Sequence, residues 1–201
     1  MLVGGRDEVA VAAVVDALPS AGPWLVDLAD DDALAAAAAG LGRLDVLVNN
    51  AGVADERPFT ELTRGDWRRS FEVNVFAVAE LTRLCLPALR TARGLVVMMN
   101  SGSGMMSYPH GAVYTGTKFA LRTMADCLRE EERVHGVRVT SVHPGFVDTD
   151  MGCGIRAQNS VPDGPGLYVA PETIAAGVRL AVDAPPEAQV ETLSIRPSRL
   201  A

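Results

Sequence analysis

Residues 112–121 read Ala-Val-Tyr-Thr-Gly-Thr-Lys-Phe-Ala-Leu, which places Tyr114 four positions before Lys118. Residues four apart lie on one face of an α-helix, about one turn from each other. A phenol has an unperturbed pKa of about 10, and a neighbouring ammonium favours the phenolate and lowers that pKa towards neutral pH. The stretch therefore predicts a helix whose tyrosine is a general acid or base. A surface lysine beside a half-buried tyrosine would have the same spacing.

The lysine itself is unusual for this composition. Of the 18 basic residues, 17 are arginine, and Lys118 is the only lysine in the chain. A compact ammonium suits the task of stabilising a phenolate, whereas the planar guanidinium of arginine does not do the same job. The one position that takes lysine therefore points to chemistry.

A serine precedes this helix at a second informative place. Ser101 follows the apolar run Leu95–Met99 and stands 13 residues before Tyr114. The end of a strand would place its hydroxyl where it can hydrogen-bond a substrate oxygen next to the tyrosine. The alternative for any serine in Asn100-Ser101-Gly102-Ser103-Gly104 is ordinary turn chemistry.

Outward from these segments, short apolar runs alternate with helical patterns. This alternation is typical of βαβ units, and continuous apolar runs are typical of strands buried on both faces. The sequence predicts a single α/β domain over residues 1–201, with a Rossmann-like, doubly wound and mostly parallel sheet. The expected strands are Trp24–Val26, Leu44–Val48, Gly94–Met99, Val137–Val142 and Thr192–Ile195, and the expected helices are Glu8–Leu18, Asp31–Ala39, Asp66–Arg90, Val113–Glu132 and Pro171–Val182.

The segment Met151–Val169 differs from the rest because it is rich in glycine and proline and has no period. It follows the carboxyl end of a predicted strand, where open α/β sheets bind ligands. We expect it to be a substrate loop, with a merely tolerated connection as the alternative.

Several segments, taken in order, resemble the short-chain dehydrogenase/reductase family over essentially the whole chain. Leu47–Gly52 is similar to its NNAG segment, and Met98–Ser101 to the strand that ends in the family's serine. Tyr114–Lys118 is similar to its YxxxK helix, and His143–Thr149 to its PG segment. Asn74, within Val73-Asn74-Val75, is similar to the family's helix asparagine.

That resemblance implies a catalytic set of Ser101, Tyr114, Lys118 and Asn74. Tyr114 would exchange a proton with a substrate carbonyl or alcohol, Lys118 would lower its pKa and bind the ribose, Ser101 would orient the substrate oxygen, and Asn74 would hold a water of the proton relay. The implied cofactor is NADP, with NAD possible, because Arg6 can pair with a 2′-phosphate although Asp7 is adjacent. The other implied cofactor contacts are Asp27, Leu28, Asn49, Asn50, Ala51, Gly52, Pro144, Gly145, Val147 and Thr149.

The start of the sequence departs from the family. Its members normally open with a strand and a TGxxxGxG turn that binds the pyrophosphate, whereas Leu2-Val3 resembles the end of the second strand. Gly4-Gly5-Arg6 is no substitute, because Ala10 and Val11 follow in place of a third glycine. Either this sequence starts late, by about thirty residues of one βα unit, or Leu2–Val3 occupies the vacant central place in the sheet.

Composition narrows the remaining possibilities. A net charge of −7 disfavours nucleic acid as a partner. The sequence has no apolar stretch long enough for a membrane span and no signal-peptide pattern at its start. Three cysteines without CxxC spacing indicate thiols of a reducing cytoplasm, and three scattered histidines predict no metal site.

The leading functional hypothesis is a carbonyl reductase or alcohol dehydrogenase for a small organic substrate. The alternative is a non-catalytic scaffold that dimerises without binding cofactor, which the absent phosphate loop would favour. Resemblance also implies a homodimer or homotetramer, in which Asp66–Arg90 and Val113–Glu132 pair with their copies. Their apolar stripes, which include Phe71, Val78 and Leu81, could instead only cover the sheet.

Overall fold

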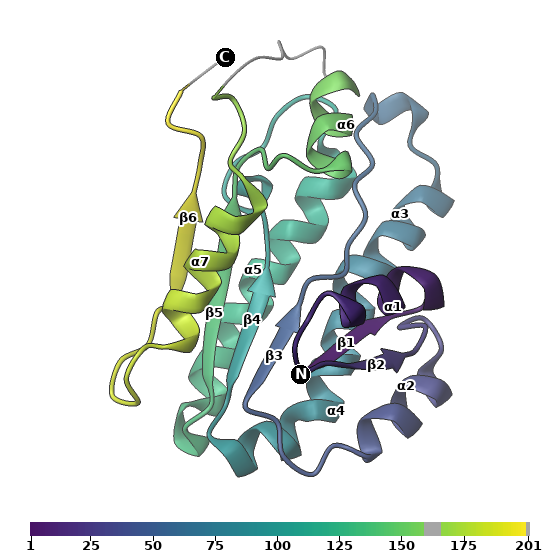
Figure 1. Ribbon diagram of the computed structural model, residues 1–201. Helices are drawn as coiled ribbons and strands as arrows, with labels where there is room; N and C mark the ends of the chain where they lie inside the picture. The colour runs from purple at the N-terminus through teal and green to yellow at the C-terminus, as the bar shows by residue number, and fades with distance from the viewer. Residues whose placement is uncertain (159–165, 200–201) are drawn as a thin grey trace.

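In residues 1–158 and 166–199, which the computed structural model describes, six strands pair only in parallel (Figure 1). Helices cover both faces of the strands, so the predicted Rossmann-like α/β class is confirmed. The strands are β1 (Leu2–Gly5), β2 (Gly22–Leu25), β3 (Val46–Asn49), β4 (Leu95–Met99), β5 (Arg138–Pro144) and β6 (Thr192–Ile195).

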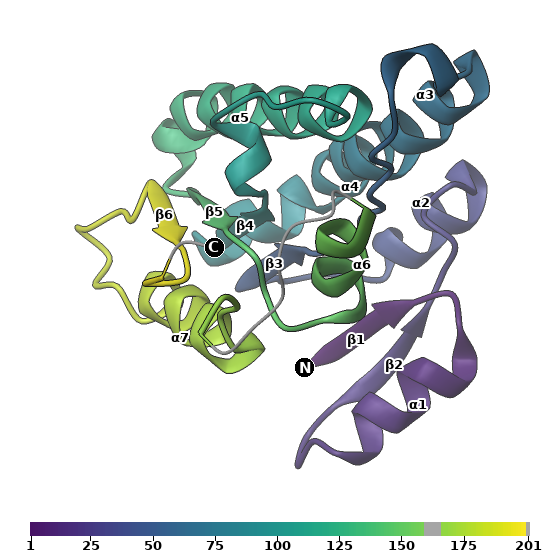
Figure 2. The same cartoon turned by 90° about the horizontal axis from the view of Figure 1, so that it is seen from above.

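The strands are divided between two sheets. β1 pairs with β2 in the register Leu2 to Gly22, and the second sheet has the order β3-β4-β5-β6, with Val48 opposite Val97. Figure 2 shows the β1–β2 pair set apart from β3. In the described chain Leu2–Gly5 therefore pairs with β2 and not with β3, and the inner edges of β1 and β3 carry no ladder partner.

Three of the seven α-helices in the described residues begin at polar caps. Asp7, Asp30 and Thr63 each accept a backbone N–H at an N-cap, which satisfies a donor that has no partner within the helix. The helices are α1 (Glu8–Asp16), α2 (Asp31–Ala39), α3 (Arg64–Phe71), α4 (Ala77–Ala92), α5 (Ala112–Glu132), α6 (Asp150–Gln158) and α7 (Pro171–Val182), with short 3₁₀ turns η1 (Phe59–Glu61), η3 (Gly102–Gly104) and η4 (Arg133–His135).

The long helix predicted over Asp66–Arg90 is interrupted. It consists of α3, a π-helical segment η2 (Glu72–Phe76) and α4. The segment contains no glycine or proline that would mark a break, so the sequence does not locate the π-turn. This segment carries Asn74, one of the predicted site residues.

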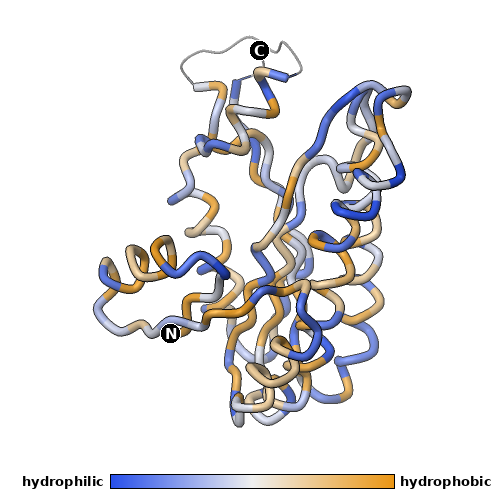
Figure 3. Tube along the Cα trace, turned by 90° about the vertical axis from the view of Figure 1, so that its right-hand side faces the viewer, coloured by the Kyte–Doolittle hydropathy of each residue, from blue (hydrophilic) through white to orange (hydrophobic). Residues whose placement is uncertain are grey.

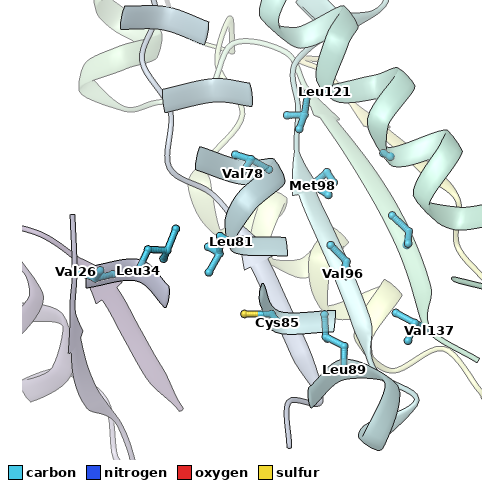
Figure 4. Close-up of a cluster of buried hydrophobic side chains, with 12 residues drawn as sticks. Val26, Leu34, Val78, Leu81, Cys85, Leu89, Val96, Met98, Leu121 and Val137 are labelled. Carbon is cyan, nitrogen blue, oxygen red and sulfur yellow. The ribbon is translucent and has the colours of Figure 1, made fainter. Parts of the chain in front are cut away.

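The core lies on both faces of β4. Val96 and Met98 point into a cluster with α2, α4 and α5, whereas Leu95 and Val97 point into a second cluster with α7. Figure 4 shows the first cluster, and Figure 3 shows apolar stretches along the strands. Alternate side chains of one strand enter opposite clusters, which explains why β4 is apolar throughout.

The segment predicted as a loop over Met151–Val169 is partly helical. α6 occupies Asp150–Gln158, and Thr149 Oγ1 accepts the backbone N–H of Gly152 at 3.1 Å in its first turn. The prediction was wrong there because glycine and methionine at this spacing give no clear amphipathic period. Residues 159–165 of the predicted substrate loop lie outside the described residues.

Candidate active site

Tyr114 and Lys118 lie on the face of α5 that packs towards the end of β4. Both side chains are buried, and the Lys118 ammonium is 5.7 Å from the centroid of the Tyr114 ring. Lys118 Nζ donates a hydrogen bond of 2.9 Å to the backbone oxygen of Met99, the last residue of β4. The strand end and the helix therefore hold the predicted pair together.

Burial favours the neutral form of both groups, so it shifts the pKa of the tyrosine and the pKa of the lysine in opposite directions. Desolvation raises the pKa of Tyr114, and this outweighs the lowering by a hydrogen bond with Ser101. Desolvation also lowers the pKa of Lys118 to about 8. In the protein by itself the pKa of Tyr114 is thus shifted upward, so the predicted lowering by Lys118 is not the net effect of this environment.

Ser101 lies in a tight turn against α5. It is the N-cap of η3, and its Oγ accepts the backbone N–H of Ser103 at 3.1 Å. A Cβ at Gly104 would lie 2.9 Å from the backbone oxygen of Lys118, so this turn needs glycine to approach the helix. The hydroxyl that is predicted to bind the substrate oxygen is therefore the same hydroxyl that caps this turn.

A buried histidine supports the Ser101 backbone. His143 Nδ1 lies 2.9 Å from the Ser101 carbonyl oxygen, and its Nε2 lies 2.9 Å from Ser141 Oγ. A carbonyl only accepts, so Nδ1 carries the hydrogen and Nε2 accepts from Ser141. Burial lowers the pKa of His143, in keeping with this neutral tautomer. The sequence predicted no such role for this histidine.

Three further polar residues extend from Ser101, and no role was predicted for them. Ser101 Oγ donates to Ser103 Oγ at 3.2 Å, Ser103 Oγ lies 2.8 Å from Tyr108 Oη, and Tyr108 Oη donates to Glu56 Oε1 at 2.6 Å. Glu56 is only 4% exposed. The separation of Glu56 from Tyr108 by 52 residues explains why no local motif indicated the contact.

Asn74 joins the loop after β3 to α5. Its Nδ2 donates to the backbone oxygen of Val53 at 2.8 Å and to Thr117 Oγ1 at 3.0 Å, and its Oδ1 accepts the Val53 N–H at 2.8 Å. A Cβ at Gly52 would lie 3.3 Å from Asn74 Oδ1 and 3.9 Å from Lys118 Nζ. The structure therefore brings Gly52, Asn74 and Lys118 together.

The predicted adenosine-binding residues lie at the carboxyl ends of β1 and β2. An open pocket there is lined by Arg6, Asp7, Leu25, Val26 and Asp27. Arg6 and Asp27 form an exposed ion pair of 3.7 Å.

The other residues predicted to contact the adenosine end differ in how deeply they are buried. Leu28 packs against the core, and Asn49 is buried with its Nδ2 bonded to Thr82 Oγ1. Asn50 and Ala51 are exposed beyond the end of β3. Asn49 Oδ1 is buried without a hydrogen-bond partner in the described chain.

The PG segment follows β5 at the same edge of the sheet. Pro144 ends β5, the Gly145 N–H donates to the Ile195 oxygen at 2.8 Å, and Val147 bridges to Val169. Thr149 is exposed and caps the first turn of α6. These residues therefore lie near the carboxyl ends of β5 and β6, and none of them lines the pocket that contains Arg6.

The residues present fit the two ends of a dinucleotide. The pocket lined by Arg6 can receive the adenosine end of the cofactor with its charged phosphate. Gly52 has no side chain, so its backbone is open next to the Lys118 ammonium and the Asn74 amide. Among the described side chains, no group of three or more histidine, cysteine or acidic residues is arranged to hold a metal. In the same residues, no helix is long and apolar enough to cross a membrane.

Comparison with known proteins identifies the family. The model of the short chain dehydrogenase family matches residues 1–160, so this chain belongs to that family. An uncharacterised oxidoreductase of Staphylococcus saprophyticus is 33% identical, with 78% of this chain and 66% of the relative covered. L-xylulose reductase of Bos taurus is 36% identical, with 73% of this chain and 61% of the relative covered.

The chain spans about half to two thirds of the length of such relatives, from 47% for a Bos taurus family member to 66% for the staphylococcal protein. Among solved structures, an alcohol dehydrogenase from Thermococcus sibiricus complexed with 5-hydroxy-NADP has a TM-score of 0.87 and 25% identity, covering 100% of this chain and 86% of that one. A metagenomic short-chain oxidoreductase in complex with NADP has a TM-score of 0.81 and 29% identity, covering 99% and 86%.

Proposed function

We propose that this protein is an NADP-dependent oxidoreductase that interconverts a small organic carbonyl and its alcohol. The observation that carries the proposal is the buried Tyr114–Lys118 pair at the end of β4. An ionisable pair placed away from water at the carboxyl edge of a parallel sheet costs stability, and such strained placement clusters at active sites.

In this proposal Tyr114 is the general acid for reduction and the general base for oxidation. Burial keeps its phenol protonated, which suits the donation of a proton to a carbonyl oxygen. When bound, the nicotinamide supplies the hydride. Lys118 favours the phenolate that remains after proton donation, and Ser101 orients the substrate oxygen. Asn74 holds the loop that carries Gly52 against this pair.

We assign the choice of NADP over NAD to Arg6. It lines the pocket at the ends of β1 and β2 and is 76% exposed, so its guanidinium can leave Asp27 for a phosphate. We assign the adenine side to Asp27, Leu28 and the segment Asn49–Gly52, and the nicotinamide side to Pro144, Gly145, Val147 and Thr149. Relatives that carry NADP in their structures support this choice.

Residues 151–169 are proposed as the substrate-side segment of a single domain. Within them α6 follows the carboxyl end of β5, and Arg156 stacks on Phe146 and Tyr168. A reducing cytoplasm is proposed as the location, supported by the free thiols of Cys85 and Cys127.

A homodimer or homotetramer is also proposed. Val78, Leu81 and Cys85 of the predicted stripe belong to the core, so covering the sheet accounts for that face of α4. Phe76 and Phe119, however, are 54% and 39% exposed on η2 and α5. These rings support a contact between copies through the same helices.

The test is titration with NADPH followed by the fluorescence of the cofactor, with Arg6→Ala and Tyr114→Phe variants in parallel. Saturable NADPH binding that is weaker in Arg6→Ala than in the wild type supports the proposed enzymatic function. Absence of binding by a folded, dimeric wild type would favour the alternative function, a scaffold without cofactor.

A further inference from the structure

Arg156 carries a buried charge that the proposed reaction does not use. It belongs to α6, and only 3% of the residue is exposed. Its guanidinium carbon lies 4.7 Å from the centroid of the Phe146 ring and 5.0 Å from the centroid of the Tyr168 ring. Its Nη1 donates to the backbone oxygen of Leu167 at 3.5 Å. The faces of aromatic rings attract a cation, so these rings stabilise a charge that burial alone would disfavour.

The two rings stand at the two ends of the segment that contains α6. Phe146 follows β5 in the PG segment, and Tyr168 directly precedes Val169. The Val169 N–H donates to the Phe146 oxygen at 2.9 Å, and the Asp148 N–H donates to the Val169 oxygen at 3.0 Å. The chain therefore leaves this short parallel pairing, forms α6 and returns to it. Arg156 contacts a ring on each side of the pairing.

The first turn of α6 is anchored on the same PG segment. Thr149 Oγ1 accepts the Gly152 N–H at 3.1 Å, and the Cys153 N–H donates to the Thr149 oxygen at 2.8 Å. A Cβ at Gly152 would collide with the backbone oxygen of Val147, so this close approach needs glycine. These contacts hold the start of the helix, whereas Arg156 lies in its last turn.

We propose that Arg156 is a positioning residue that clamps the last turn of α6 onto Phe146 and Tyr168 and thereby fixes the PG segment at the carboxyl end of β5. The clamp touches no reacting atom and acts through Phe146. Its effect on catalysis rests on the proposed function, which assigns the nicotinamide side to the PG segment. Arginine suits the clamp because its planar guanidinium stacks on rings, which a compact ammonium does not do.

Trypsin measures the clamp directly, because it cleaves after arginine and lysine. Arg156 is the only such residue between Arg138 and Arg179, so a cut there reports the opening of α6. The cleavage rate follows the population of the open form when reclosing is faster than cleavage. The full chain is digested briefly without ligand, and the fragments are quantified by mass spectrometry. Cleavage after Arg93, exposed at the C-cap of α4, is the reference within each digest.

Phe146→Leu and Tyr168→Leu each remove one ring and keep Arg156 as the cleavage site. We expect cleavage after Arg156 to be about three- to tenfold faster in each, because a cation–ring contact away from water shifts the opening equilibrium by that order. Phe59→Leu, at a ring that is 70% exposed, is the matched control and should leave this rate unchanged. Cleavage after Arg93 should be the same in all the variants.

Arg156→Lys separates stacking of the guanidinium from mere packing of the rings. Lysine keeps a trypsin site, and each rate is divided by the rate of the same cut in the urea-unfolded chain. We expect Arg156→Lys to be cleaved faster than the wild type on this scale. Tyr168→Leu should then accelerate cleavage less in Arg156→Lys than in the wild type, since the stacked contact is already lost.

Reduction of small ketones by NADPH tests the positioning role. Turnover should fall by about threefold or more in Arg156→Lys and in Tyr168→Leu, because a displaced PG segment would misplace the reacting groups. NADPH affinity should stay within about twofold, since Arg6 lines a separate pocket. Phe59→Leu should keep the turnover of the wild type.

Unchanged cleavage after Arg156 in both ring variants would overturn the clamp, as would an equal effect of Tyr168→Leu in the wild type and in Arg156→Lys. Faster cleavage combined with wild-type turnover would overturn the positioning role. A wild type that neither binds NADPH nor reduces ketones would contradict the proposed function, and digestion by trypsin would still decide whether the clamp exists.

Discussion

Replacement of Asn74 by alanine tests how the site is assembled. The carboxamide is 1% exposed and makes three hydrogen bonds, two to the Val53 backbone and one to Thr117 Oγ1, each 2.8–3.0 Å long. Thr117 gives its own hydrogen to the backbone oxygen of Tyr114, so its Oγ1 depends on Asn74 as a donor. At about 1 kcal/mol for each neutral bond, the variant should lose about 3 kcal/mol of unfolding free energy.

For a domain of this size that loss corresponds to a melting temperature lower by roughly 6–12 °C. The assay is thermal and urea unfolding followed by circular dichroism, with Asn50→Ala at an exposed position as the matched control. Asn74→Asp should also destabilise at neutral pH, because two donors become a charged acceptor facing oxygen atoms. Melting of Asn74→Ala within about 2 °C of wild type would refute the reasoning, since bonds worth about 1 kcal/mol each cannot then exist there.

Three further outcomes follow from the same contacts. The pKa of Lys118 is lowered from 10.5 to about 8, so the unfolded chain holds that proton more tightly between these pH values. The free energy of unfolding should therefore rise by about 2 kcal/mol from pH 7 to 9.5 relative to Lys118→Met, and parallel pH profiles would contradict this. Arg6→Ala should weaken NADPH binding more than NADH binding, and an unchanged preference would remove the assignment of Arg6. Light scattering at micromolar concentration should give a dimer or tetramer that Phe119→Glu weakens; a clean monomer of the wild type argues against that assembly.

The predictable part of the fold is the part that hydrophobic period and capping specify. Asp31–Ala39, Pro171–Val182 and Thr192–Ile195 have the predicted bounds, and each begins at a polar residue or a proline. The π-segment at Glu72–Phe76 and the helix at Asp150–Gln158 were not predictable in this way. No glycine or proline marks the π-turn, and glycines within α6 weaken its helical signal.

The candidate site likewise contains residues that local sequence predicts and residues that only the folded chain brings together. Tyr114, Lys118 and Ser101 could be found from local spacing and from the end of an apolar run. Glu56 could not, because its contact with Tyr108 joins segments that only the folded chain brings together. The upward shift of the Tyr114 pKa was likewise beyond the sequence, since it depends on how completely the phenol is buried.

The central claim is that Tyr114 is the acid–base group of a carbonyl-reducing site. The most direct measurement is NADPH oxidation by wild type and Tyr114→Phe with a series of small ketones and aldehydes, alongside NADPH titration of both proteins. Phenylalanine keeps the buried ring beside Lys118 and removes the proton. We predict that turnover falls by at least ~10²-fold while NADPH affinity stays within about twofold. Turnover retained by Tyr114→Phe would contradict the account.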